Sequence, residues 1–183
     1  MSNGILKAIE LGKIWMKKSI DETHDYNHAK NVEKHAVEIF RELQPKGLTE
    51  EIVRLAVWWH DAYKSRCKQV TFDSIWNEGR KSAVIFQEEV GPLLDFKTMA
   101  IVSKAIITHN RATYAMINKR KLDDLSLILI EADQLDGLNY VRVKREEKNI
   151  KNPFILLLDR LLTAFVPLFV LVIHRSKYGR DKL

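Results

Sequence analysis

The stretch Ala56-Val57-Trp58-Trp59-His60-Asp61-Ala62-Tyr63-Lys64 decides the fold of this chain of 183 residues. Its first half is apolar and continues a helical pattern that starts near Thr49. His60 follows Ala56 by one helical step, so its ring is expected beside the core-facing stripe of that helix. The next residue, Asp61, adds a carboxylate to this imidazole. Both groups are ligands that a divalent cation accepts, so the stretch predicts a metal site inside a helical bundle.

Two residues far away in the sequence are expected to complete this site. His28 stands at the start of another predicted helix, after polar residues 21–25 that can supply its N-cap. Asp133 falls on the apolar side of a helix predicted over residues 125–138, where a carboxylate is costly unless a cation or strong donors compensate it. The predicted metal ligands are therefore His28, His60, Asp61 and Asp133.

The composition favours one all-helical domain over residues 1–183. With 46% hydrophobic and 30% charged residues, the chain resembles ordinary globular proteins, and its length suits one well-cored domain. Only 7 Gly and 4 Pro interrupt it, which favours helices over a many-stranded sheet. The periodicity predicts helices over residues 5–19, 26–43, 49–63, 74–90, 99–109 and 125–138, with a loop over 65–70 and a charged connector over 144–152.

Charge and cysteine content narrow the class of protein. The net charge of +6 suits anionic substrates. The basic clusters at 17–18, 119–121 and 142–148 are not interleaved with aromatic residues, which disfavours a nucleic-acid-binding role. The single cysteine, Cys67, excludes an internal disulfide and a cysteine-rich zinc site. Residues 1–19 do not have the pattern of a secretory signal. We therefore expect a cytoplasmic protein.

The segment 153–173 is apolar except for Asp159 and Arg160. Its uncharged part, residues 161–173, is 13 residues long, below the roughly 18 that indicate a membrane-spanning helix. A segment that is apolar on all faces still needs cover. We expect a C-terminal helix that is buried or faces a second copy in a homo-oligomer, and membrane association is the alternative.

The order of these motifs resembles the HD-domain superfamily of metal-dependent phosphohydrolases. The stretch 24–32 (HDYNHAKNV) is similar to the first family motif, 56–64 (AVWWHDAYK) to the second, and 132–136 (ADQLD) to the last. The resemblance extends over about residues 20–140. It implies a single compact helical bundle with the active site between helices.

The resemblance also implies roles for individual residues. The four predicted ligands would bind one divalent ion (Mn, Co, Ni, Mg, Fe or Zn), and Asp61 would orient the attacking water. Lys64 would contact a phosphate oxygen. His109 would contact phosphate, protonate a leaving group or help to hold a second metal. His24 and Asp136, in the first and last motifs, are assigned to substrate binding. Glu78 is assigned to the catalytic residues by similarity to one branch of the superfamily.

Three functions remain open from the sequence. The favoured one is hydrolysis of a phosphate ester or anhydride of a small phosphorylated compound, preferably a nucleotide, by a metal-activated water. The alternatives are a catalytically silent nucleotide-binding or regulatory module and a membrane-associated or structural partner protein. A one-metal site is favoured because the two-metal branches need further histidines, and only His109 is available between Asp61 and Asp133.

Overall fold

The computed structural model describes residues 3–67, 71, 76–109, 122–137, 150, 153–154, 156–157, 160–161 and 176–181. These residues form helices and turns, and no strand occurs among them. The predicted all-α class is therefore confirmed. The elements in chain order are α1 (Asn3–Lys17), α2 (Tyr26–Leu43), α3 (Glu50–Trp59), η1 (Lys64–Arg66), α5 (Glu78–Val90), η2 (Gly91–Leu93), α6 (Phe96–Thr108), α8 (Asp124–Gly137) and α11 (Lys177–Asp181).

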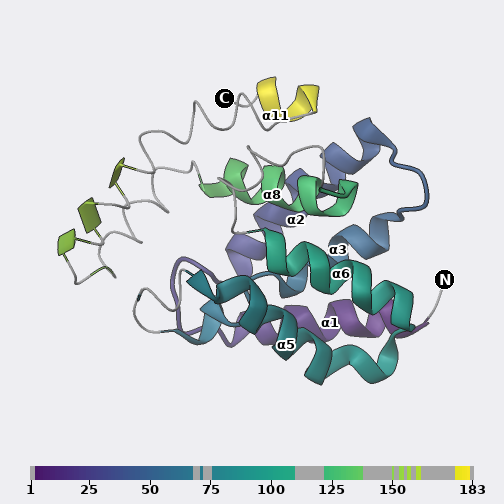
Figure 1. Ribbon diagram of the computed structural model, residues 1–183, viewed down its shortest axis with the longest axis horizontal. Coiled ribbons are helices and arrows are strands. Elements are labelled where there is room, and N and C mark those ends of the chain that lie inside the picture. Colours follow the sequence, from purple (N-terminus) through teal and green to yellow (C-terminus); the bar gives the residue numbers. More distant parts are fainter. Residues whose placement is uncertain are drawn as a thin grey trace.

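Helix α3 holds the bundle together, because it packs against α1, α2, α5, α6 and α8. Helix α2 lies between α3 and α8, and α5 lies along α6 (Figure 1). This packing places the start of α2 beside α8, about a hundred residues later in the chain. Three helices from distant parts of the sequence therefore meet around the C-terminal end of α3.

Tryptophan side chains fix the end of α3 within the core. The Trp59 indole donates to the Ala8 carbonyl oxygen over 3.0 Å, which ties α3 to α1. Trp15 of α1 donates in turn to the carbonyl oxygen of Ala62, over 3.0 Å. The guanidinium of Arg66 lies over the Trp15 ring, with its carbon 4.3 Å from the centroid. These contacts hold the turn that carries His60 and Asp61 against α1.

The helix ends follow the expected capping chemistry, with differences at three points. The Asp25 carboxylate caps α2, and Gln44 ends it in the left-handed conformation with φ 45°. Helix α3 ends at Trp59, so His60 and Asp61 lie in the turn that follows. Part of the predicted loop after it is the short 3-10 helix η1. Helix α6 begins three residues earlier than predicted, because Asp95 caps it through the Thr98 amide.

The C-terminal part of the chain is described only in pieces. The predicted apolar helix 153–173 and the connector 144–152 lie largely outside the described residues. Both stay predictions, as does the single domain over residues 1–183. Within the described part of the chain, no helix is long and apolar enough to cross a membrane. Helix α11 packs on α2, where the Glu42 carboxylate accepts the backbone N–H groups of Lys177 and Tyr178.

A glycine lets α5 approach α6 closely. A Cβ atom at Gly79 would lie 2.7 Å from the carbonyl oxygens of Ile106 and Ile107. Real Cβ atoms do not come so close to backbone, so only glycine fits there without movement of one helix. Its neighbour Glu78 begins α5 and is buried. The close approach thus sets the position of the Glu78 side chain relative to the end of α6.

We predict that Gly79→Ala destabilises the protein by about 1–3 kcal/mol, because the added methyl group overpacks a backbone contact. Urea unfolding measures this change. Gly91→Ala is the matched control, since its Cβ would meet only the Met99 sulfur at 3.5 Å and its φ is −49°. The control should stay within about 0.5 kcal/mol of the wild type. Equal stability of the two variants would contradict the close approach.

Candidate metal centre

His28 enters the site from the first turn of α2. The Asp25 carboxylate accepts the His28 backbone N–H over 2.9 Å, so the cap of the helix also fixes where this residue begins. The ring Nδ1 of His28 donates to Asp136 Oδ2 over 2.7 Å. This bond leaves Nε2 as the nitrogen whose lone pair can bind a cation.

His60 is oriented in the same way by the backbone. Its Nδ1 donates to the carbonyl oxygen of Val57 over 2.6 Å, and the residue is completely buried. Its Nε2 lies 3.2 Å from Nε2 of His28. Two imidazoles therefore present the same nitrogen to one point, each with its other nitrogen already occupied.

Two carboxylate oxygens complete the group. Asp61 Oδ2 lies 3.0 Å from His28 Nε2 and 3.1 Å from His60 Nε2. Asp133 Oδ1 lies 3.4 and 3.7 Å from the same two nitrogens. All four ligand atoms are within 4.8 Å of one another. Ligands about 2.1 Å from one tetrahedral ion are about 3.4 Å apart, so the separations fit a single cation.

The hydrogen bonding of Asp61 Oδ2 shows whether an ion would fit between these ligands. Asp61 is 2% exposed, and this oxygen receives no hydrogen bond from the described residues. A buried carboxylate oxygen without a donor is costly. A divalent cation among His28, His60 and Asp133 would satisfy it. The donor set, two nitrogens and two oxygens, suits Mn, Fe, Co, Ni or Zn and does not select one of them.

A second group of ligand atoms shares Asp61. Its Oδ1 lies 3.3 Å from His109 Nε2, which in turn lies 3.7 Å from Glu78 Oε1. The ligand atoms of Asp61, Glu78 and His109 are also within 4.8 Å of one another. The Lys64 ammonium is 3.5 Å from Glu78 Oε2. Lys64 and His109, which lie far apart in the sequence, are thus both beside Glu78.

His24 lies beside the first group and has a partner that the sequence analysis did not assign. Its ring is edge-on to His28, with the centroids 5.7 Å apart. Nδ1 of His24 lies 3.1 Å from Asp21 Oδ2, and both residues are buried. Asp21 also accepts from Thr23, and these bonds, against the effect of burial, hold its pKa far below the usual 3.8. A capping role was expected for residues 21–25, but Asp21 also orients His24.

The charged groups of the cluster shift one another's pKa values. Burial alone would lower the pKa of His60, but the Asp61 and Asp133 carboxylates raise it well above 6.5. Burial would raise the pKa of Asp61, but the surrounding histidines hold it well below 3.8. Protons and a metal ion therefore compete for the same atoms, and metal binding is expected to release protons.

Every residue with a predicted site role is placed in or beside this cluster. The four predicted ligands converge, and His24, Lys64, Glu78 and His109 surround them. Asp136 lies behind His28, where it accepts bonds from the ring and from the Asn31 amide. Asn31 was not singled out from the sequence. The individual roles stay predictions.

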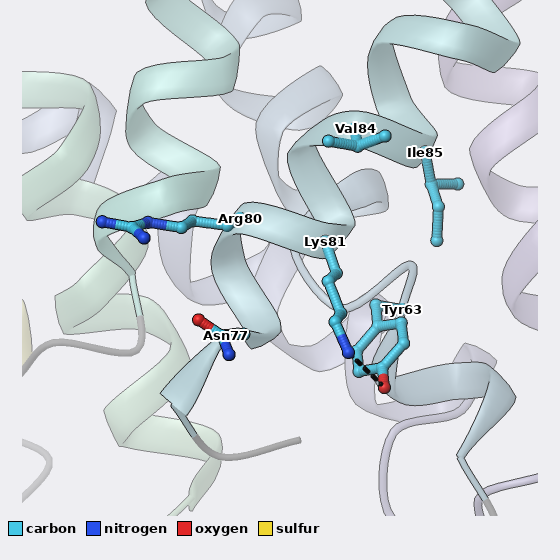
Figure 2. Close-up of a pocket in the computed structure, with 6 residues that line it drawn as sticks. All are labelled: Tyr63, Asn77, Arg80, Lys81, Val84 and Ile85. Atoms are coloured by element: carbon cyan, nitrogen blue, oxygen red, sulfur yellow. Dashed lines mark hydrogen bonds between the residues drawn. The ribbon is translucent and has the colours of Figure 1, made fainter. Parts of the chain in front are cut away.

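The outer face of α5 carries a separate hollow. A cavity of about 410 Å³ is lined by Tyr63, Asn77, Arg80, Lys81, Val84 and Ile85. The Lys81 ammonium donates to the Tyr63 hydroxyl over 3.1 Å (Figure 2). The lining of this cavity includes none of the clustered ligand residues. Two of its residues, Tyr63 and Asn77, directly precede Lys64 and Glu78 in the chain.

The fold is similar to that of a solved crystal structure from an uncultured Thermotogales bacterium, described as a predicted HD superfamily hydrolase. The two chains are 19% identical, with a TM-score of 0.55 over 91% of this chain and 88% of that one. No protein-family model and no curated protein matches the chain. The structural similarity confirms the HD-type helical fold that the sequence motifs predicted.

We predict that the stability of the ion-free protein falls as the pH rises from about 6.5 to about 9. Burial lowers the pKa of His109, but hydrogen bonds to Asp61 and Glu78 outweigh it and raise the pKa to about 9. The folded state thus binds this proton more tightly than the unfolded chain, so its contribution is complete below pH 6.5 and lost through pH 9.

The expected loss is about 1–3 kcal/mol in the free energy of unfolding. Urea unfolding in EDTA at several pH values measures it. His109→Asn should reduce the slope in this window to the part that His60 contributes, whereas His35→Asn, outside the cluster, should leave it unchanged. A wild-type slope that persists in His109→Asn would show that another group is responsible.

We also predict that Asp136→Asn weakens metal binding by about 10- to 100-fold, because the carboxylate that orients His28 is lost. Calorimetric titration with Mn²⁺ measures the affinity. Asp124→Asn, in the first turn of the same helix, is the matched control and should bind like the wild type. Unchanged affinity in Asp136→Asn would remove its assignment as a positioning residue and favour the substrate contact.

Proposed function

We propose that this chain is a metal-dependent phosphohydrolase of the HD type and that it acts on a small phosphorylated compound. A nucleotide is the favoured candidate for this substrate. The observation that carries the proposal is that ligand atoms of the buried His28, His60 and Asp61 and of the half-buried Asp133 all lie within 4.8 Å of one another. Its support is the fold, which is similar to that of a protein described as a predicted HD superfamily hydrolase.

The metal supplies the chemistry that these side chains lack. His28, His60, Asp61 and Asp133 would hold a divalent ion, which would supply Lewis acidity toward a phosphoryl oxygen and toward the attacking water. Asp61 suits the positioning of that water, because it is buried and its Oδ1 faces away from the two ligand histidines toward His109.

The cations around the metal group suit a phosphate. Lys64 lies beside Glu78 and would bind a non-bridging oxygen. His109, held by Ile106 through Nδ1, has its Nε2 directed to the carboxylates and would protonate the leaving oxygen. His24, held by Asp21, would contact phosphate from the side of α2. For Asp136 the contacts favour the orientation of His28 over a substrate contact.

The identity of the metal, the bond that is cleaved and a cytoplasmic location are parts of the same proposal. The metal is Mn, Co, Ni, Mg, Fe or Zn, and the cleaved bond is a phosphate ester or anhydride. A screen of nucleoside mono-, di- and triphosphates with each ion, scored by the release of phosphate and pyrophosphate, identifies the metal and the bond that is cleaved. A nucleotide that raises the melting temperature without product under any metal would instead support a silent binding or regulatory module.

We predict that His60→Ala and Asp61→Ala each lower turnover by on the order of 10³-fold or more. Both remove a ligand of the reacting metal. Steady-state kinetics at saturating metal measures the loss, and circular dichroism checks that helicity is kept. His35→Ala, whose ring contacts Tyr178 away from the cluster, is the control and should keep its activity. Near-normal turnover in either ligand variant with the metal still bound would sink the proposal.

A further inference from the structure

Helices α2 and α8 bring His28 and Asp133 together from distant parts of the chain. Nε2 of His28 lies 3.4 Å from Oδ1 of Asp133, and a metal site tolerates errors of only about 0.2 Å in its ligand distances. Apolar packing between the two helices is non-directional, so it does not by itself fix how far one helix slides along the other. Directional bonds have to set that register. Asp136 supplies two of them at the metal end, where it accepts from His28 and Asn31.

Helix α8 is also held from its other side, by the C-terminal residues 176–181. The Ser176 hydroxyl donates to the Glu131 carboxylate, and it accepts the Gly179 backbone N–H over 2.8 Å. Ser176 is completely buried, and Glu131 is 2% exposed. Glu131 precedes Asp133 by two residues, which is about 200° around an α-helix, so the two carboxylates project to nearly opposite sides of α8. The bond to Ser176 therefore anchors α8 from the side away from Asp133, and α8 lies between α11 and α6 in Figure 1.

The same C-terminal segment is bonded to α2. The Glu42 carboxylate, near the end of α2, accepts the backbone N–H groups of Lys177 and Tyr178 over 2.6 and 2.8 Å. The Tyr178 hydroxyl lies 3.0 Å from Nδ1 of His35. His35 follows His28 by seven residues, or about two helical turns, so both rings project from the same face of α2. The segment thus joins the helix of one predicted metal ligand to the helix of another.

We infer that residues 176–181 are a brace for the metal centre, and that Ser176 is a positioning residue that acts through Glu131. Without the Ser176 hydroxyl, the buried Glu131 carboxylate loses a donor, which is costly away from water. Helix α8 then shifts to bring water or another donor to that carboxylate, and Asp133 moves with it. The inference rests on the proposed function, since it takes the four predicted ligands as the site of a metal ion.

The test is the affinity of the full chain for Mn²⁺, measured by calorimetric titration well below the melting temperature of each variant. Ser176→Ala should bind Mn²⁺ about tenfold more weakly than the wild type, at the low end of the range for groups that support metal ligands. Ser103→Ala is the matched control, because Ser103 is also a buried serine that joins two helices, α5 and α6, through Gln87. The control should lower the melting temperature and leave the affinity unchanged.

A second variant removes the anchor of the brace on α2. Glu42 is exposed, so Glu42→Ala leaves the interior intact, and it should weaken Mn²⁺ binding by a smaller factor than Ser176→Ala. Glu10→Ala, which removes an exposed carboxylate paired with Lys13 on α1, should not change it. Electron paramagnetic resonance of the bound Mn²⁺ adds a readout that a loss of fold stability does not move, because a displaced ligand broadens the lines of the ion.

Wild-type affinity and an unchanged Mn²⁺ spectrum in Ser176→Ala and Glu42→Ala would overturn the inference, even if both variants melt at lower temperature. The segment would then stabilise the fold and have no part in positioning the ligands. If Ser176→Ala does not fold, Glu42→Ala decides alone. No bound ion in the wild type would instead defeat the proposed function itself.

Discussion

The structure depends on the burial of the Asp61 carboxylate. A carboxylate that is 2% exposed can stay ionised only if positive charge or donors surround it. His28 and His60 face one oxygen and His109 faces the other. Each of these histidines comes from a different helix end, so the charge balance of one side chain requires α2, α3 and α6 to meet. Loss of that convergence would leave a buried charge uncompensated, which is far costlier than loss of a surface ion pair.

Apolar packing supplies the precision that this charge balance needs. Trp59 and Trp15 fix the turn after α3 against α1, and the absence of a side chain at Gly79 lets α5 reach α6. The second nitrogen of each imidazole is tied to a group behind it: His28 to Asp136 and His60 to the Val57 carbonyl oxygen. These bonds fix the orientation of each ring before any ligand arrives, so a cation that displaces the protons on Nε2 meets nitrogens that already point to one place.

The sequence predicts the ligands better than it predicts what orients them. Helical spacing places His60 and Asp133 toward the core, and the motif order joins them to His28; the structure brings these atoms together. The Asn31 amide contact with Asp136, 105 residues away, has no periodic signal, because it depends on how α2 packs against α8. The contact between Asp21 and His24 could have been predicted from the sequence, since a spacing of three residues permits it. The same polar residues also fit the pattern of a helix N-cap, which is how they were interpreted. Tertiary packing decides such cases, and local pattern does not.

The charges of the cluster explain why the proposed phosphate chemistry would need a metal ion. Asp61, Glu78 and Asp133 bring three carboxylates to the two groups of ligand atoms. Without a divalent cation, an approaching phosphate would meet these carboxylates with only the Lys64 ammonium and histidines to offset them. The carboxylates would then repel the phosphate anion. A metal held by His28, His60, Asp61 and Asp133 would reverse the sign of the charge that the phosphate meets, and Asp61 would then act as a ligand instead of repelling the anion. Under the proposed function, substrate binding and catalysis would therefore both depend on the same ion, and Lys64 and the histidines would hold a phosphate only once the metal is bound.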